Sequence, residues 1–194
     1  MILFKKIERD SADKETLAVV ERFIQEKAFQ SHKSAPPPLP TVVVYAQDEE
    51  SGVVLGTMGL DMPKNRALTL ATHWDVPLDG DIERFVQIGR WFVDKEKAPK
   101  HLAAAILYPA PLVSVMYEKN EWICELKEKV FDRFAYYGCE PCRVDQGTIK
   151  LENIPAEGLP YYQDGQTIIC TMSIDVVLLA VKKYIVSDGA IQLD

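Results

Sequence analysis

The chain has 194 residues, of which 47% are hydrophobic and 26% charged. These proportions exclude disorder for most of the chain, and the length predicts one domain over residues 1–194. Lys and Arg number 22 and Asp and Glu number 29, so the net charge is −7. This charge argues against a nucleic-acid binder, because such proteins need a positive surface.

The start of the chain and its cysteines predict a cytoplasmic protein. The apolar residues 1–4 give way at once to charged residues, so no secretory signal forms, and no apolar stretch approaches the roughly 20 residues that span a bilayer. Without export, the four cysteines are expected as reduced thiols. Cys139 and Cys142 have the spacing of zinc and redox sites, but no second ligand pair accompanies them, so we expect no metal.

The first half of the chain predicts one helix, a proline-rich connector and four strands. Apolar residues recur at helical spacing over residues 11–30 and predict an amphipathic helix capped by Asp10 or Ser11. Residues 31–40 contain four prolines and are expected as an extended connector or lid. Runs rich in β-branched residues predict strands at 41–46, 53–61, 68–76 and 84–94, the first two as a hairpin.

The second half predicts alternating helices and strands. Residues 100–108 have helical patterning, but Pro109 and Pro111 kink or break this helix before residues 112–119, so we expect two pieces. The remaining expected elements are a strand at 122–126, a helix at 130–137 ended by Gly138, a strand at 141–145, a loop at 147–165, a strand at 166–175 and a helix at 176–185. This order predicts an α/β fold with one mixed central sheet flanked by helices.

Several stretches resemble sequences of one enzyme family. Residues 87–94 read QIGRWFVD, which is similar to the fourth strand of the acyl-homoserine-lactone synthases and the related N-acyl amino acid synthases. Residues 133–138, 158–165 and 173–176 resemble the short helix, the Gly-x-Pro loop and the final strand of these enzymes. The resemblance implies a GNAT-like fold and transfer of an acyl group to a small amine such as an amino acid. It implies a phosphopantetheine thioester as donor, on an acyl carrier protein or coenzyme A.

Three departures from the family pattern bear on the catalytic base, the reaction and the acyl donor that we expect. Gln87 stands where the family has a glutamate, and an amide cannot take a proton from an amine. Residues 16–40 lack the pattern that engages S-adenosylmethionine in the lactone synthases, which argues against lactone synthesis. The loop at 95–101 lacks glycines that would let backbone N–H groups approach a pyrophosphate, so a carrier-protein donor with a single phosphodiester suits it better than coenzyme A.

The resemblance also implies how the donor is held. In GNAT-like folds the fourth strand splays from the fifth, so the segments at 85–94 and 121–126 are expected to part. Backbone N–H groups of Trp91, Phe92 and Val93 would then face the thioester carbonyl.

Other side chains are candidates for donor contacts, each with a plainer alternative. Three lysines would meet the donor phosphate, although each taken singly is as readily solvated charge: Lys95, Lys97 and Lys100. Five apolar residues are candidates for an acyl tunnel, although core packing is their commoner role: Trp74, Trp91, Phe92, Met116 and Tyr117.

Arg90 is the charged residue of the fourth predicted strand. Regular alternation places it on one face with Val86, Ile88 and Phe92. Among apolar neighbours a guanidinium needs a carboxylate partner, so we expect either an internal ion pair or a contact with substrate.

Proton transfer has several candidate residues. His73 and Glu83 are candidates for a base acting through water, although a histidine within a strand is more commonly held by a hydrogen bond alone. Tyr136 and Tyr137 are candidates to protonate the departing thiolate, although the family's usual position falls at Phe134.

Two rival functions remain open. Gln87 and the glycine-free loop also suit a GNAT-fold protein that has lost catalysis and acts as a binding or regulatory module. Plain acetyl-coenzyme A transfer is the other rival, and it predicts tight coenzyme A binding that weakens when Lys97 or Lys100 is changed. Acyl length, acceptor and oligomeric state do not follow from the sequence.

Overall fold

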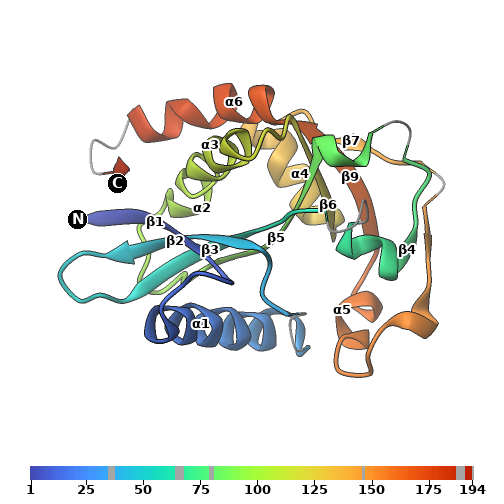
Figure 1. Ribbon diagram of the computed structural model, residues 1–194, viewed down its shortest axis with the longest axis horizontal. Helices are drawn as coiled ribbons and strands as arrows, with labels where there is room; N and C mark the ends of the chain where they lie inside the picture. Colours follow the sequence, from blue (N-terminus) through green and yellow to red (C-terminus); the bar gives the residue numbers. More distant parts are fainter. Residues whose placement is uncertain (35–37, 64–67, 79–80, 146, 187–190, 194) are drawn as a thin grey trace.

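The computed structural model describes residues 1–34, 38–63, 68–78, 81–145, 147–186 and 191–193, so Pro36 and Pro37 of the predicted connector lie outside the described residues. Its centre is an eight-stranded sheet with strand order β10-β1-β2-β3-β5-β6-β9-β7 (Figure 1). The strands are β1 (Ile2–Glu8), β2 (Val42–Asp48), β3 (Val54–Asp61), β5 (Phe85–Val93), β6 (Glu121–Lys127), β7 (Cys142–Arg143), β9 (Thr167–Ser173) and β10 (Ile191–Leu193). A separate pair joins β4 (Trp74–Asp75) to β8 (Thr148–Ile149).

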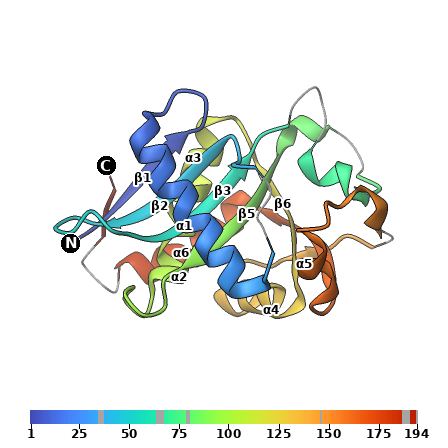
Figure 2. The same ribbon diagram turned by 90° about the horizontal axis from the view of Figure 1, so that it is seen from below.

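Helices lie on both faces of the large sheet. They are α1 (Lys14–His32), α2 (Leu102–Ala105), α3 (Pro109–Met116), α4 (Glu128–Tyr137), α5 (Leu159–Gln163) and α6 (Ile174–Val186), with 3-10 turns η1 (Thr69–Thr72), η2 (Ile82–Arg84) and η3 (Leu151–Asn153). Figure 1 shows α2, α3, α4 and α6 on one face and α1 on the other, where α5 also lies; Figure 2 shows α1 crossing the strands obliquely. The mixed α/β architecture predicted from the sequence is confirmed.

The two faces bury separate apolar clusters. The larger cluster lies under α2, α3, α4 and α6 and contains the fully buried Trp122, Ile106 and Leu107. On the opposite face, the cluster under α1 includes Val20 and Ile24. None of the helices among the described residues is both long and apolar enough to cross a bilayer.

Several expected elements differ in detail. The first helix is capped by Asp13, whose carboxylate accepts a hydrogen bond of 2.8 Å from the Thr16 amide, and not by Asp10 or Ser11. The predicted strand at 68–76 is instead η1 followed by the two residues of β4. Residues 2–8, for which no element was predicted, form β1 between β2 and β10.

The glycine signal predicted the end of α4 correctly, and the proline signal predicted a divided helix, although α3 begins at Pro109 and ends at Met116 rather than covering residues 112–119. The helix expected at 100–119 is divided into α2 and α3, and Pro109 opens α3, where its missing N–H would be unpaired in any case. Gly138 ends α4 in the left-handed conformation, with φ 86°. The segment expected as a loop at 147–165 contains β8, η3 and α5.

Candidate active site

The strands β5 and β6 are paired over only part of their lengths. Their parallel ladder starts at Phe85 and ends where Ile88 faces Cys124, although β5 continues to Val93 and β6 to Lys127. Beyond this point β5 stays with β3, and β6 stays with β9. The parting expected from the sequence is therefore confirmed, and each strand follows its outer neighbour.

A β-bulge lies in β5 immediately beyond the ladder. Gly89 faces Gly59 and Phe92 faces Thr57, so two residues of β5 oppose the single residue between Gly59 and Thr57 on β3. Arg90 takes up this extra residue with φ 50°, in the left-handed region. The Thr57 hydroxyl donates a hydrogen bond of 3.0 Å to the Arg90 carbonyl and holds the bulge.

The bulge reverses the alternation of side chains along β5. Trp91 and Val93 pack against the cluster under α2, α3, α4 and α6, the same cluster that holds Val86 and Ile88. Phe92 packs on the α1 side. The predicted face shared by Val86, Ile88, Arg90 and Phe92 is therefore wrong, because the extra residue shifts every later side chain of the strand to the other face.

Aromatic side chains surround Trp91 on the face under α4. The Trp91 ring stacks on buried Phe134 with centroids 4.9 Å apart, and its Nε1–H donates to the Ala103 carbonyl at 3.1 Å. Tyr137 meets the Trp91 ring edge-on at 6.4 Å, and burial raises the pKa of Tyr137. Tyr136 is 81% exposed, so the structure does not bring it together with Trp91 as a proton donor to this face.

Three backbone N–H groups of the turn after β5 are hydrogen-bonded to Asp94. The Asp94 carboxylate accepts hydrogen bonds from the amides of Glu96 and Lys97 at 3.1 and 3.2 Å, and the Asp94 carbonyl accepts from the Ala98 amide at 2.8 Å. An ion pair of 3.0 Å joins Asp94 to Lys27 of α1. The lysines expected to meet a phosphate are exposed around this turn: Lys95, Lys97 and Lys100.

Glu125 lies on the opposite face, at the first position of β6 beyond the ladder. Trp74 Nε1–H donates to Glu125 Oε2 at 2.8 Å, and the Tyr162 hydroxyl forms a second hydrogen bond to this carboxylate. Burial raises the pKa of Glu125, although these two hydrogen bonds and the positive charges of Lys127 and Arg90 oppose the shift.

Arg90 has no carboxylate within ion-pair distance among the described residues. Its Nη2 donates to the Pro38 carbonyl at 2.7 Å, and its buried Nε–H has no hydrogen-bond partner. Burial lowers the pKa of Arg90, while the charges of Asp61 and Glu125 oppose this shift. The predicted internal ion pair is thus absent there, because Asp61 is held by the hydroxyls of Thr41 and Thr69.

The other predicted residues have different surroundings. Gln87 is buried, and its Oε1 accepts a hydrogen bond of 2.7 Å from the Leu70 amide. His73 ends η1 and is not inside a strand; its Nδ1 lies 3.4 Å from the Tyr162 hydroxyl, and burial lowers its pKa. Glu83 is exposed before the start of β5, 3.6 Å from Lys119, so the structure does not bring it together with Arg90.

The sequence interpretation missed Glu125 and Tyr162. A signal for Glu125 was present, since it is a lone carboxylate between apolar residues Cys124 and Leu126. Tyr162 lies in the stretch 158–165 that resembles the family's Gly-x-Pro loop, but nothing in that stretch predicted a role for this side chain, because α5 falls in a segment expected as loop.

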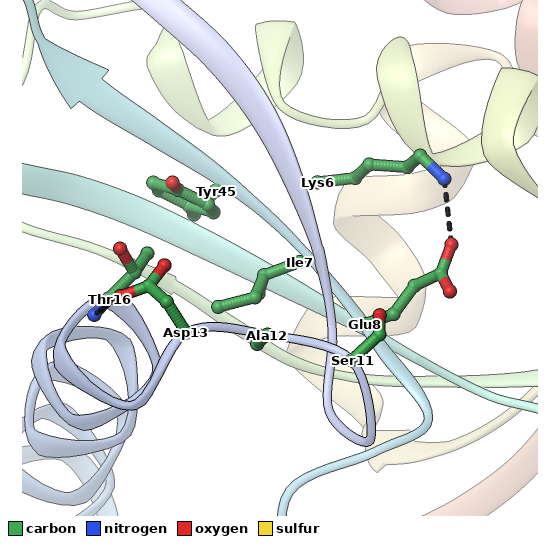
Figure 3. Close-up of a pocket in the computed structure, with 8 residues that line it drawn as sticks. All are labelled: Lys6, Ile7, Glu8, Ser11, Ala12, Asp13, Thr16 and Tyr45. Atoms are coloured by element: carbon green, nitrogen blue, oxygen red, sulfur yellow. Dashed lines mark hydrogen bonds and ion pairs between the residues drawn. The ribbon is translucent and has the colours of Figure 1, made fainter.

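A pocket of about 370 Å³ lies between β1, β2 and the start of α1. Figure 3 shows the residues that line it. Its charged side chains already have partners: the Lys6 ammonium pairs with Glu8 at 2.8 Å, and Asp13 caps α1. No residue of β5 or β6 lines it, so it is separate from the diverging strands. Among the described residues, no group of three or more His, Cys, Asp or Glu side chains is placed to hold a metal ion.

Comparison with known proteins gives structural neighbours only. No protein-family model and no curated protein matches this chain. The acyl-homoserine lactone synthase LasI superposes with a TM-score of 0.68 at 9% identity, covering 94% of this chain and 95% of LasI. The coenzyme A-dependent acyl-homoserine lactone synthase BjaI, solved with SAM and isopentyl-CoA, gives 0.65 at 16% identity, covering 100% of this chain and 93% of BjaI. An acyl-CoA N-acyltransferase from Pseudomonas aeruginosa gives 0.57 at 13% identity, covering 89% and 99% of the two chains.

At these low sequence identities, the superpositions support a conclusion about the fold alone. The neighbours match nearly the whole chain, and they include both lactone synthases and an N-acyltransferase. With the parted strands and the bulge of β5, the chain has the GNAT-like acyltransferase fold, in a form similar to that of the acyl-homoserine lactone synthases.

Proposed function

We propose that this protein is an N-acyltransferase that moves an acyl group from a phosphopantetheine thioester to a small amine such as an amino acid. The observation that carries the proposal is the end of the β5–β6 ladder at Ile88 and Cys124, with Arg90 and Glu125 just beyond it. Acyl transfer needs donors for the developing oxyanion and an acceptor for the amine proton. The candidate donors for the oxyanion and the candidate acceptor for the amine proton both lie at this point of the sheet.

The face under α4 suits the donor. Beyond Ile88, the edge of β5 has no strand partner on its β6 side among the described residues, so backbone N–H groups near Trp91, Phe92 and Val93 can meet the thioester oxygen. The stacked rings of Trp91 and Phe134 provide an apolar wall beside that edge. This wall is the proposed contact for the start of the acyl chain or the pantetheine arm.

The face with α1 and α5 suits the acceptor. There the half-buried Arg90 side chain has a buried, unpaired Nε–H, which can bind an anionic group such as the carboxylate of an amino acid. Glu125 is a carboxylate on the same face, with its pKa raised by burial. An amine placed between them has a partner for its negative group and a base for its proton.

The turn at Asp94 indicates which carrier of the acyl group the protein prefers. The amides of Glu96 and Lys97 already donate to the Asp94 carboxylate, so they are not free to hold a pyrophosphate. The exposed lysines around the turn are point charges that suit a single phosphodiester. We therefore propose an acyl carrier protein as the preferred donor in the cytoplasm, with acyl-coenzyme A as the alternative.

The test is acyl transfer by the purified chain with a panel of donors and acceptors. Acyl carrier protein and coenzyme A thioesters of graded length are each incubated with amino acids and other small amines, and thiol release and N-acyl products are measured by mass spectrometry. S-adenosylmethionine belongs in the acceptor panel because BjaI was solved with it. We expect a product with the wild type and at least a tenfold smaller rate with Arg90→Ala; no product from any pair overturns the proposal.

A catalytically inactive binding module is the second candidate. Gln87 favours it, since this position lacks a carboxylate and its amide is engaged by the Leu70 backbone. Native mass spectrometry separates the two: a stable complex with acyl thioester, together with no turnover under any condition, supports the binding module. A complex that turns over supports the enzyme.

A further inference from the structure

We propose that Glu125, Tyr162 and His73 form a proton path in which Glu125 takes the proton of the attacking amine and His73 delivers it to solvent. This inference rests on the proposed acyl transfer and deepens it. The three side chains come from β6, α5 and the end of η1. Their hydrogen bonds make one connected chain.

The contacts along the path are continuous. The Tyr162 hydroxyl is hydrogen-bonded to the Glu125 carboxylate, and the same hydroxyl oxygen lies 3.4 Å from His73 Nδ1. The His73 and Tyr162 rings meet edge-on, with centroids 6.3 Å apart. A contact of 3.4 Å is long for a hydrogen bond, but catalytic hydrogen bonds often shorten when substrate binds.

A hydrogen bond fixes the position of the Glu125 carboxylate, as a general base requires. Trp74 Nε1–H donates to its Oε2 at 2.8 Å, which fixes the carboxylate at the point where β5 and β6 part. Gln87 on β5 faces Ile123 in the ladder and is engaged by the Leu70 amide. The available carboxylate therefore lies on β6, one strand away from Gln87.

The groups around the path shift the pKa values of Glu125 and His73 toward each other. The charged groups that act on Glu125 are Arg90 from β5 and Lys127 from β6, and the Tyr162 hydroxyl from α5 is hydrogen-bonded to its carboxylate. The charge of Glu125 in turn helps to raise the pKa values of Tyr161 on α5 and Cys124 on β6. Burial outweighs the two cations and raises the pKa of Glu125, while burial lowers the pKa of His73. The two shifts bring the acid and the imidazole closer in proton affinity, which favours transfer between them.

The proton is conserved at each step. As the amine nitrogen forms its bond to the thioester carbon, its N–H proton passes to a Glu125 oxygen. The protonated Glu125 then donates to Tyr162 Oη, and the Tyr162 hydroxyl proton passes to His73 Nδ1. His73, now an imidazolium, releases its Nε2 proton to water and returns to the neutral form, and the acyl carbon expels the thiolate.

The first experiment measures the pH dependence of acyl transfer with the donor and amine that the panel identifies. Glu125→Gln is expected to lower kcat roughly 10²–10⁴-fold, the range of a lost general base, and to remove the acidic limb of the pH profile. His73→Ala is expected to lower kcat at least tenfold and to regain activity when imidazole is added. Tyr162→Phe should lower kcat and raise the solvent deuterium isotope effect.

Tyr161→Phe is the matched control, because Tyr161 is the adjacent residue on α5 and packs on His32 and Lys127. It should retain activity within threefold and keep the pH profile. Wild-type pH profiles in Glu125→Gln or Tyr162→Phe, or no effect of imidazole on His73→Ala, overturn the path.

A second experiment does not depend on turnover. In the full chain with ¹³C-labelled glutamate carboxyls, the Glu125 resonance, assigned by Glu125→Gln, is titrated in the wild type, Tyr162→Phe and Tyr161→Phe. Loss of the Tyr162 bond to the carboxylate should raise the Glu125 titration midpoint only in Tyr162→Phe. An unchanged midpoint overturns the path, whereas a failed donor and amine panel with the expected midpoints overturns only the proposed activity.

Discussion

The Thr57 hydroxyl donates a hydrogen bond of 3.0 Å to the Arg90 carbonyl, between strands β3 and β5. Thr57 is fully buried, and Arg90 has φ 50°, which is uncommon for a residue other than glycine. This bond holds the bulge that sends Trp91 to one face of the sheet and leaves Arg90 near Asp61 and Glu125 on the other. The two proposed substrate faces therefore depend on one hydroxyl.

We first predict that Thr57→Val destabilises the protein although it preserves the side-chain volume. It leaves the partly buried Arg90 carbonyl without this donor, which should cost about 1–3 kcal/mol of unfolding free energy. Urea unfolding measures the change. Thr57→Ser keeps the hydroxyl and should lose less, and a Thr57→Val protein as stable as the wild type would show that the bond does not hold the bulge.

The second prediction concerns the turn after β5. Burial disfavours the charged Asp94, but the ion pair with Lys27 and the amides of Glu96 and Lys97 outweigh burial and lower the pKa of Asp94. Its stabilising effect is therefore complete above the unfolded pKa of about 3.9 and is lost as pH falls through the lower folded value. Asp94→Asn should cost about 1–2 kcal/mol at pH 7 and progressively less below about pH 4.

Thermal unfolding at pH 7 and at pH 3 measures this difference. Glu152→Gln, a change at an exposed residue of η3, is the control and should have no effect at either pH. An Asp94→Asn cost that is the same at both values would contradict the assignment.

The third prediction is that Gln87→Glu does not improve acyl transfer and destabilises the protein. The new carboxylate would be buried across from Asp61, its partner in the β3–β5 ladder. Repulsion and burial should raise the pKa of the introduced carboxyl, so the cost is absent below about pH 4.3 and grows as pH rises toward the folded value. Gln87→Met should also destabilise, since it leaves the Leu70 amide unpaired, but without pH dependence.

Urea unfolding between pH 4 and pH 8 distinguishes these two variants. The same slope with pH for Gln87→Glu and Gln87→Met would be evidence that Gln87 does not face Asp61 in a buried pair.

The sequence predicted the motif of β5, the division between α2 and α3 and the end of α4, because Pro109 and Gly138 act through local backbone geometry. It did not predict the bulge, since strict period-two alternation is the default for a strand and nothing at Arg90 marks an extra residue. Glu125 was missed for a different reason: Trp74, which holds its carboxylate, is 51 residues away in the chain. A site assembled by such long-range contacts has no local pattern.

The fourth prediction is a conflict between stability and function at Glu125. Because burial raises the folded pKa of Glu125, ionisation costs native-state stability as pH rises above the unfolded pKa of about 4.3. Glu125→Gln should therefore match the wild type near pH 4 and be more stable at pH 8, by about 1.4 kcal/mol for each pKa unit of the shift. Urea unfolding at the two pH values tests this, and lower stability at pH 8 would mean that the ionised carboxylate is favoured by its neighbours.

The fifth prediction concerns the four thiols. Cys124, Cys139 and Cys170 are buried, and only Cys142 is exposed. Cys124 and Cys170 face each other across β6 and β9 with sulfurs 3.2 Å apart, and burial raises the pKa of the Cys124 thiol well above its usual value, which disfavours the reactive thiolate. An aromatic disulfide reagent should therefore label about one thiol rapidly in the folded protein, and all four only after unfolding. Cys142→Ser should abolish the rapid phase, whereas rapid labelling in that variant would show that a thiol buried in the structure is accessible in the folded protein.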